Sequence, residues 1–145
     1  MPGGASRHEA RERALALLYE ADSKMVAPAS VLDELPVVPD PYAVDLVCGV
    51  ERERDRIDAL IAGHAIDWTV ERMPVIDRTV LRMGTYELLA RPDVPTGVVL
   101  SEAVELAKRY STEDSGRFVN GVLAAVADAT RPGSSGQATD LPPPG

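Results

Sequence analysis

The sequence is poor in aromatic side chains and has a single cysteine. Phe, Trp and Tyr make up 4% of the 145 residues, whereas 45% are hydrophobic, so the core has to be built mainly from Leu, Val, Ile and Ala. Cys48 has no second cysteine with which to form an internal disulfide, which favours a reducing, cytoplasmic location. No uncharged run approaches the roughly 18 residues of a membrane span, and the N-terminus lacks the apolar core of a signal peptide. We therefore expect a soluble intracellular protein.

Positive charge is also scarce. Fifteen Lys and Arg side chains stand against 23 Asp and Glu side chains, which gives a formal net charge of −8 at pH 7. Because nucleic acids are polyanions, charge alone predicts only weak non-specific affinity for them.

The residue types that carry out catalysis or bind metals do not occur in any known spacing. His8 and His64 are the only histidines, and neither belongs to an HExxH or CxxC pattern. The sequence has no glycine-rich phosphate loop after a strand and no GxSxG motif. Glu51 and Glu53 alternate with arginines, which is typical of a solvated helix surface. These observations predict no enzymatic activity, no metal site and no cofactor.

Helical patterning runs through most of the chain. Residues 1–6 are small and expected to be flexible, and residues 131–145 form a Pro/Gly/Ser-rich tail that is expected to be disordered. Between them, residues 7–130 predict one all-α domain of six or seven helices, because Ala, Leu, Glu and Arg are abundant and prolines mark the breaks. The expected helices lie at 8–22, 28–35, 41–65 (with a break near 54–56), 75–91, 97–110 and 115–130, with a short helical turn at 68–72.

The stretch "EDSGRFVNGVL" (113–123) holds the only phenylalanine of the chain, near the start of the last helix. At about 100° per residue, Phe118 falls on one edge of the apolar stripe and Asn120 just beyond the other. Asp114 or Ser115 is the predicted N-cap. Two interpretations of Phe118 stay open: it covers the end of a neighbouring helix, or it is half-exposed and stacks on a nucleic acid base.

The first helix presents a similar choice. Its apolar stripe is built from alanines and leucines, and His8, Arg11 and Tyr19 are predicted to point away from it. Either these side chains form an ordinary solvated face, or Tyr19 stacks on a base beside the two cationic groups.

The segment "VIDRTVLRMGTYELLAR" (75–91) predicts a helix with a broad apolar arc that contains two carboxylates, Asp77 and Glu87. A buried carboxylate needs a partner. An internal arginine is the favoured partner, and a contact with another protein is the alternative. Arg78, Arg82 and Thr85 are expected to form the opposite, polar face.

Four segments, in this order and spacing, resemble the NusB family of transcription antitermination factors: "ARERALALLYEAD", "DRTVLRMGTYELL", "DVPTGVVLSEAVELAK" and "STEDSGRFVNGVL". The resemblance runs from about residue 7 to residue 129. It implies an all-helical fold of two packed halves and a non-enzymatic role. Members of the family pair with NusE, a ribosomal protein of the small subunit, bind the single-stranded boxA element of nascent RNA, and help RNA polymerase to read through terminators, especially in ribosomal RNA operons.

The resemblance also implies which residues of this chain bind. The RNA-binding residues would be Arg7, His8, Arg11, Tyr19, Asp114 and Phe118. The NusE-binding residues would be Asp77, Arg78, Arg82 and Glu87. The chain departs from the family in its arm, which reads "SRHEAR" where members often have a run of arginines, so NusE would have to supply more of the affinity for RNA.

Two other functions compete with antitermination. One is a NusB-like RNA-binding module of the kind found ahead of some ribosomal RNA methyltransferases, although here a disordered tail is expected after residue 130. The other is a helical protein that forms homodimers without RNA, which leaves the "DSGRF" surface unexplained. Binding of boxA RNA with and without NusE distinguishes the three.

Overall fold

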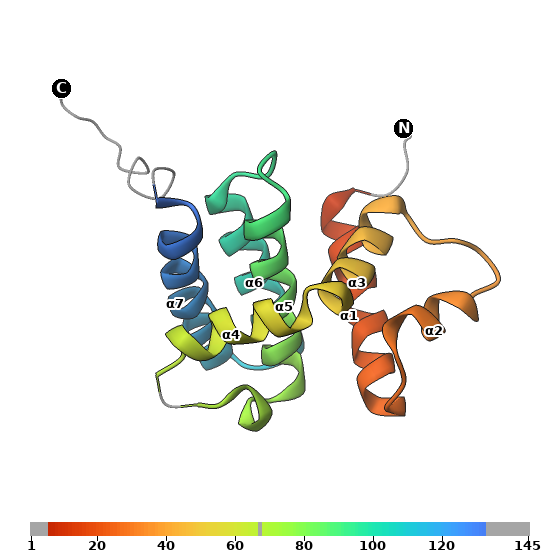
Figure 1. The fold of residues 1–145 in the computed structure, drawn as a ribbon, viewed down its shortest axis with the longest axis horizontal. Coiled ribbons are helices and arrows are strands. Elements are labelled where there is room, and N and C mark those ends of the chain that lie inside the picture. The colour runs from red at the N-terminus through yellow and green to blue at the C-terminus, as the bar shows by residue number, and fades with distance from the viewer. Residues whose placement is uncertain (1–5, 67, 133–145) are drawn as a thin grey trace.

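The computed structural model describes residues 6–66 and 68–132. Within these ranges the chain forms seven α-helices, one short 3-10 helix and no strand, which confirms the predicted all-α class (Figure 1). None of these helices is long and apolar enough to cross a membrane. The elements are α1 (Arg7–Lys24), α2 (Pro28–Asp33), α3 (Pro41–Arg52), α4 (Arg54–His64), η1 (Val70–Arg72), α5 (Val75–Ala90), α6 (Thr96–Tyr110) and α7 (Glu113–Thr130).

The helices form two halves, as the resemblance implied. In Figure 1 the half made of α1, α2 and α3 lies to the right, and the half made of α4 to α7 lies to the left. The chain crosses between the halves where α3 ends and α4 begins. This break is at Glu53, just before the predicted position, and no proline causes it.

Local capping sets several helix ends. Ser6, predicted to be part of the flexible N-terminus, is instead the N-cap of α1 in a reciprocal capping box with Glu9. The predicted N-cap of the last helix is wrong by two or three residues, because Thr112 takes that role and accepts a hydrogen bond from the Ser115 N–H at 3.0 Å. Residues 1–5 and 133–145, which include most of the two expected flexible segments, lie outside the described residues.

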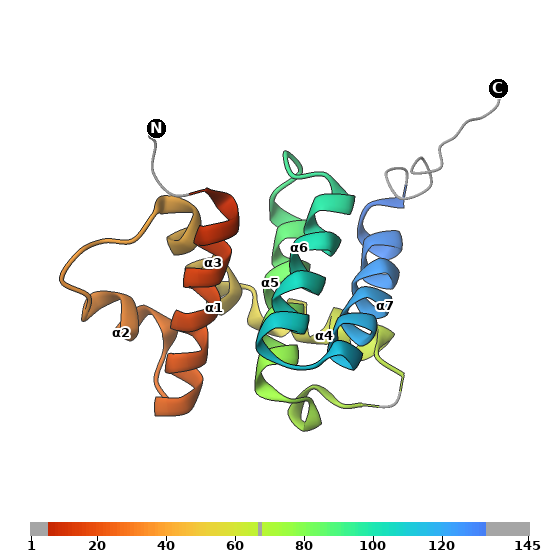
Figure 2. The same cartoon turned by 180° about the vertical axis from the view of Figure 1, so that it is seen from behind.

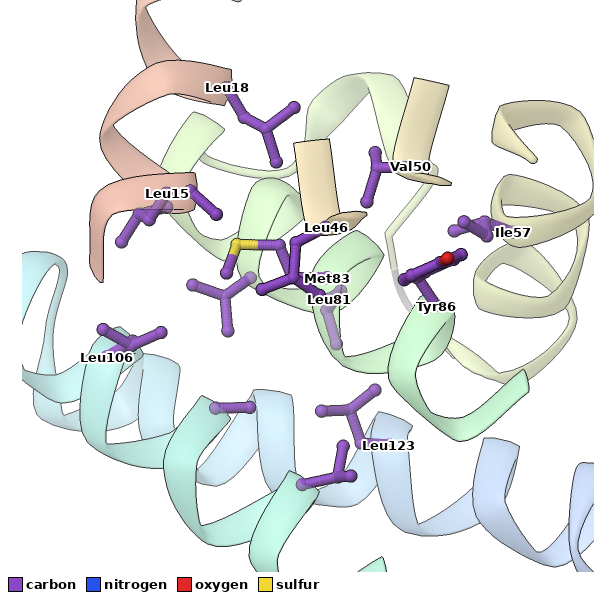
Figure 3. Close-up of a cluster of buried hydrophobic side chains, with 14 of the residues drawn as sticks. Leu15, Leu18, Leu46, Val50, Ile57, Leu81, Met83, Tyr86, Leu106 and Leu123 are labelled. Carbon is purple, nitrogen blue, oxygen red and sulfur yellow. The ribbon is translucent and has the colours of Figure 1, made fainter. Parts of the chain in front are cut away.

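Helix α5 is the central element of the fold. It packs against α1 and α3 on one side and against α4, α6 and α7 on the other. Figure 3 shows its side chains Leu81, Met83 and Tyr86 between those of the two halves. Every residue from Thr79 to Leu88 is buried, so the polar outer face predicted for Arg82 and Thr85 is wrong.

Arg131 belongs to the helical domain, although the sequence analysis assigned it to the tail. Its guanidinium donates hydrogen bonds to the carbonyl oxygens of Glu87, Leu88, Arg91 and Val94 and to the Thr96 hydroxyl, at 2.8–3.2 Å. Four of these acceptors are carbonyl oxygens at or just beyond the end of α5. The Glu87 oxygen also accepts the Arg91 N–H, whereas Leu88 is followed four residues later by Pro92, which has no N–H to donate. Arg131 therefore joins the end of α7 to the α5–α6 connection.

Candidate RNA-binding and partner-binding surfaces

The first two predicted RNA-binding residues lie at the start of α1 and already have partners. The Arg7 guanidinium lies 3.3 Å from Asp93 Oδ2 and 4.6 Å from the centre of the Tyr42 ring. His8 Nδ1 lies 2.8 Å from Glu102 Oε1 of α6, and this hydrogen bond raises the pKa of His8. Hydrogen bonds from Arg91 lower the pKa of Asp93 to about 2. RNA would therefore have to compete with carboxylates for both cationic groups.

Arg11 is not on the surface, so its predicted position on an exposed face is wrong. Its side chain is 3% exposed and donates to Glu87 from Nε at 3.0 Å and from Nη2 at 2.8 Å. The physical reason is that α1 is covered twice: its apolar stripe packs in the N-terminal half, and its opposite face meets α5. Burial alone would lower the pKa of Arg11, but the hydrogen bond and charge of Glu87 raise it.

Glu87 confirms the favoured interpretation of a carboxylate paired with an internal arginine. It is 2% exposed and accepts hydrogen bonds from Arg11 and from the Tyr42 hydroxyl. Burial and this bond to Glu87 raise the pKa of Tyr42. Since the three side chains come from α1, α3 and α5, the cluster joins the two halves and is closed to a partner in this conformation.

Within the part of the chain that the structure describes, Asp77 has no arginine partner, so the same expectation is wrong for it. The Ser115 hydroxyl donates to its Oδ2 at 2.8 Å, and both side chains are buried. Asp77 lies in the first turn of α5, and Ser115 in the first turn of α7. Two helix N-termini, each with a partial positive charge, replace the arginine.

The other two predicted partner-binding residues are arginines whose side chains are mostly covered, 14% exposed for Arg78 and 11% for Arg82. Arg82 donates to Asp58 from Nε and Nη2 at 2.8 and 2.9 Å and is largely buried. The Arg78 Nη2 lies 3.3 Å from Oδ2 of Asp22 in α1, and Asp22 is exposed. Tyr19, which is exposed, precedes Asp22 by three residues and so lies on the same face of α1. Tyr19 is therefore close to the predicted partner surface.

Phe118 lies where the helical spacing placed it. It is half-buried at the edge of the core, and Asn120 is exposed. The Phe118 and Trp68 ring centres are 6.2 Å apart with a 45° tilt, and Trp68 is itself exposed. Asp114, one turn earlier, is exposed and pairs with Arg117. Phe118 thus packs against the α4–α5 connection and leaves part of its ring accessible, and stacking on a base stays a prediction.

Helix α6 connects the arm to the Phe118 region. Figure 2 shows α6 between α1 and α7 on one face of the molecule. Glu12 of α1 accepts hydrogen bonds from Arg109 Nη1 and the Tyr110 hydroxyl, both at 2.9 Å. A groove of about 890 Å³ runs between α6 and α7, and its lining includes Lys108, Arg109, Arg117 and Asn120. Arg109 and Tyr110 were not among the predicted binding residues, although the "KRYS" stretch places an aromatic residue next to two basic ones.

Comparison with known proteins identifies the family. The model of the NusB family matches residues 8–128. The chain belongs to the NusB family. It is 45% identical to the transcription antitermination protein NusB of Kineococcus radiotolerans, over 86% of this chain and 94% of that protein. It is 50% identical to the protein of the same name from Saccharopolyspora erythraea, over 84% of this chain and 86% of that protein.

Solved structures give the same assignment. NusB of T. maritima superimposes with a TM-score of 0.80 at 34% identity, over 92% of this chain and 98% of that chain. A NusB chain crystallised with NusE and double-stranded RNA superimposes with a TM-score of 0.70 at 32% identity, over 85% of this chain and 96% of that chain. The NusB fold therefore covers nearly all of the described residues.

The surfaces of this NusB-family chain are suited to binding. Within residues 6–66 and 68–132, no three His, Cys, Asp or Glu side chains are grouped so that they could hold a metal ion. The α6–α7 groove is open and lined by both charges, with half-exposed aromatic side chains near it. Such a surface can combine stacking with contacts to phosphates.

Proposed function

We propose that this protein is a transcription antitermination factor that binds boxA RNA of nascent ribosomal RNA transcripts together with ribosomal protein NusE. It promotes read-through by RNA polymerase in the cytoplasm and acts by binding rather than by catalysis. The observation that carries the proposal is the likeness, over most of the chain, to a NusB chain crystallised with NusE and RNA. That RNA is double-stranded, so single-stranded boxA stays a prediction for this chain.

The face formed by α1, α6 and α7 is the proposed RNA-binding surface. Arg7 and His8 at one end, and Asp114 and Phe118 at the other, are the predicted contacts, with the α6–α7 groove between them. Arg11 contributes indirectly, because its bond to Glu87 holds the first turns of α1 on α5. The proposed NusE surface includes Arg78 and lies next to Tyr19. The buried Asp77 and Arg82 pack beneath this surface.

The methyltransferase-linked module has less support. The relative from Kineococcus radiotolerans is matched over 94% of its own length, so that protein has no room for a methyltransferase domain. This coverage favours an antitermination factor that acts by binding partners over a module attached to a methyltransferase.

NusE should increase RNA affinity strongly. The protein alone should bind boxA RNA weakly, because its net charge of −8 opposes a polyanion. The measurement is fluorescence anisotropy of labelled boxA RNA at fixed salt, with and without NusE and with a shuffled RNA as control. Equal affinity with and without NusE would contradict the proposal.

Phe118→Ala should weaken boxA binding in the presence of NusE by about 1–3 kcal/mol, the usual contribution of a stacked aromatic side chain. The slope of log affinity against log salt should not change, because stacking involves no counterion release. Arg7→Ala should instead reduce that slope by about 0.7 for single-stranded RNA.

Val38→Ala, which truncates an exposed apolar side chain between α2 and α3 and so outside this face, is the matched control. The unfolding free energy of Phe118→Ala should fall by less than the roughly 3–5 kcal/mol of a fully buried phenylalanine. A variant that melts early but binds RNA normally when folded would show that Phe118 serves only the core.

A further inference from the structure

A small cavity lies at the junction of the two halves. It has a volume of about 270 Å³ and is bounded by the end of α1, the start of α4 and one side of α5. Figure 1 shows that the chain crosses between the halves at the start of α4. Six of its ten lining residues are apolar, and its ionisable lining residues are Asp22, Arg54 and Arg82. Cofactor and drug-sized pockets occupy about 300–1,000 Å³, so this cavity is suited to a single side chain.

One of the lining arginines lacks an acceptor. Arg54 Nε is buried and has no hydrogen-bond partner among the described residues. Burial, and after it the charge of Arg82, lower the pKa of Arg54. Buried donors are paired in the great majority of native structures, so an orphaned guanidinium N–H needs an explanation.

The neighbouring charges do not supply that acceptor. Arg82 binds both oxygens of Asp58, and Arg78 lies against Asp22. Arg54, Arg78 and Arg82 thus have only two carboxylates between them, those of Asp22 and Asp58. One positive charge is left without a counter-charge beside the cavity. An otherwise acidic protein therefore has a local site for one negatively charged group.

The rim of the cavity favours a protein over a nucleic acid. Met25 and Val26 line it and are exposed, Met25 almost completely at 91%. Met25 also has a left-handed backbone (φ 57°), which non-glycine residues seldom adopt. Exposed apolar side chains beside an unsatisfied cation match an acidic side chain flanked by apolar ones, whereas a phosphate backbone would leave Met25 and Val26 uncovered.

We propose that this cavity receives an aspartate or glutamate side chain of the protein partner, whose carboxylate pairs with the Arg54 guanidinium while its apolar neighbours cover Met25 and Val26. The identity of the partner as NusE rests on the proposed function. The site adds a specific anchor to the adjoining Arg78–Asp22 surface. A charge-assisted hydrogen bond in a confined cavity is directional, so it would also fix the orientation of the partner.

The test compares Arg54→Met with Arg56→Met, an exposed arginine two residues further along α4. Calorimetric titration with NusE, without RNA, should show binding weakened at least about tenfold by Arg54→Met and unchanged by Arg56→Met. Arg54→Lys should also weaken binding, because a lysine keeps the charge but not the planar fork of N–H donors. The melting temperature of free Arg54→Met should stay the same or rise, since an unsatisfied donor is removed; a purely structural role would lower it.

A second measurement observes the Arg54 guanidinium directly by NMR. The Arg54 guanidinium resonances, assigned by their loss in Arg54→Met, should shift when NusE is added. Unchanged NusE affinity in Arg54→Met would overturn the proposal, and so would a loss of RNA affinity alone, which would identify the anion as a phosphate. Failure of the wild-type protein to bind NusE would overturn the proposed function and, with it, this assignment of the partner.

Discussion

Glu87→Ala should lower the unfolding free energy by about 3–5 kcal/mol, the usual loss when one partner of a buried ion pair is removed. The Arg11 guanidinium would keep its charge in a site that is 3% exposed, with its main hydrogen-bond acceptor gone. The Tyr42 hydroxyl would lose its acceptor as well. Urea denaturation followed by circular dichroism measures the change.

Two variants test the cause of this loss. Glu105→Ala removes an exposed carboxylate from α6 and should change stability by less than about 0.5 kcal/mol. The double variant Arg11→Met with Glu87→Met replaces the whole pair by apolar groups and should recover much of the stability. A stable Glu87→Ala protein that fails to bind NusE would instead support the original alternative, in which Glu87 contacts the partner.

Gly49→Ala should destabilise the protein by about 2 kcal/mol. A Cβ at position 49 of α3 would overlap the Tyr86 ring of α5. The ring cannot turn away freely, because the Tyr86 hydroxyl donates to Asp45 at 2.7 Å and accepts from Arg52. Overpacking costs about 1–3 kcal/mol and sometimes more, and the helix propensity gained by alanine offsets up to about 1 kcal/mol of it.

Gly63→Ala is the matched control, because position 63 is also helical but has no atom within 4 Å of an added Cβ. It should stabilise the protein by about 0.5–1 kcal/mol. Thermal melts of both variants measure the difference, which at 145 residues corresponds to several degrees. Equal melting temperatures would mean that α3 and α5 can separate enough to accept a methyl group.

The helices could be predicted because the features that set them are local. Pro28, Pro41, Pro74 and Pro95 each lie at or next to the start of a helix, where a missing N–H is harmless. The position of Phe118 followed from angular spacing for the same reason. By contrast, Thr112 became the N-cap of α7 in place of Asp114 or Ser115 because Ser115 is engaged by Asp77 from another helix.

The positions of Arg11, Arg82 and Thr85 could not be predicted from spacing. An apolar stripe shows which face of a helix is buried against a core, but not whether a second element covers the polar face. Here α1 and α5 are each covered from two directions, and Arg11 and Arg82 enter the interior with a carboxylate from a distant part of the chain. The orphaned Nε–H of Arg54 has no sequence signature at all, since it depends on which acceptors are already taken.

The buried stretch of α5 also has a consequence for how the protein unfolds. Leu81, Met83 and Tyr86 complete the packing of both groups of helices (Figure 3). If the chain were divided after Glu53, α1 to α3 would lose the surface that covers them, and α5 would be left with one bare side. The two halves are therefore geometrical units and not thermodynamic ones: the protein should melt in one cooperative transition, with the α5 backbone amides the last to exchange their hydrogens.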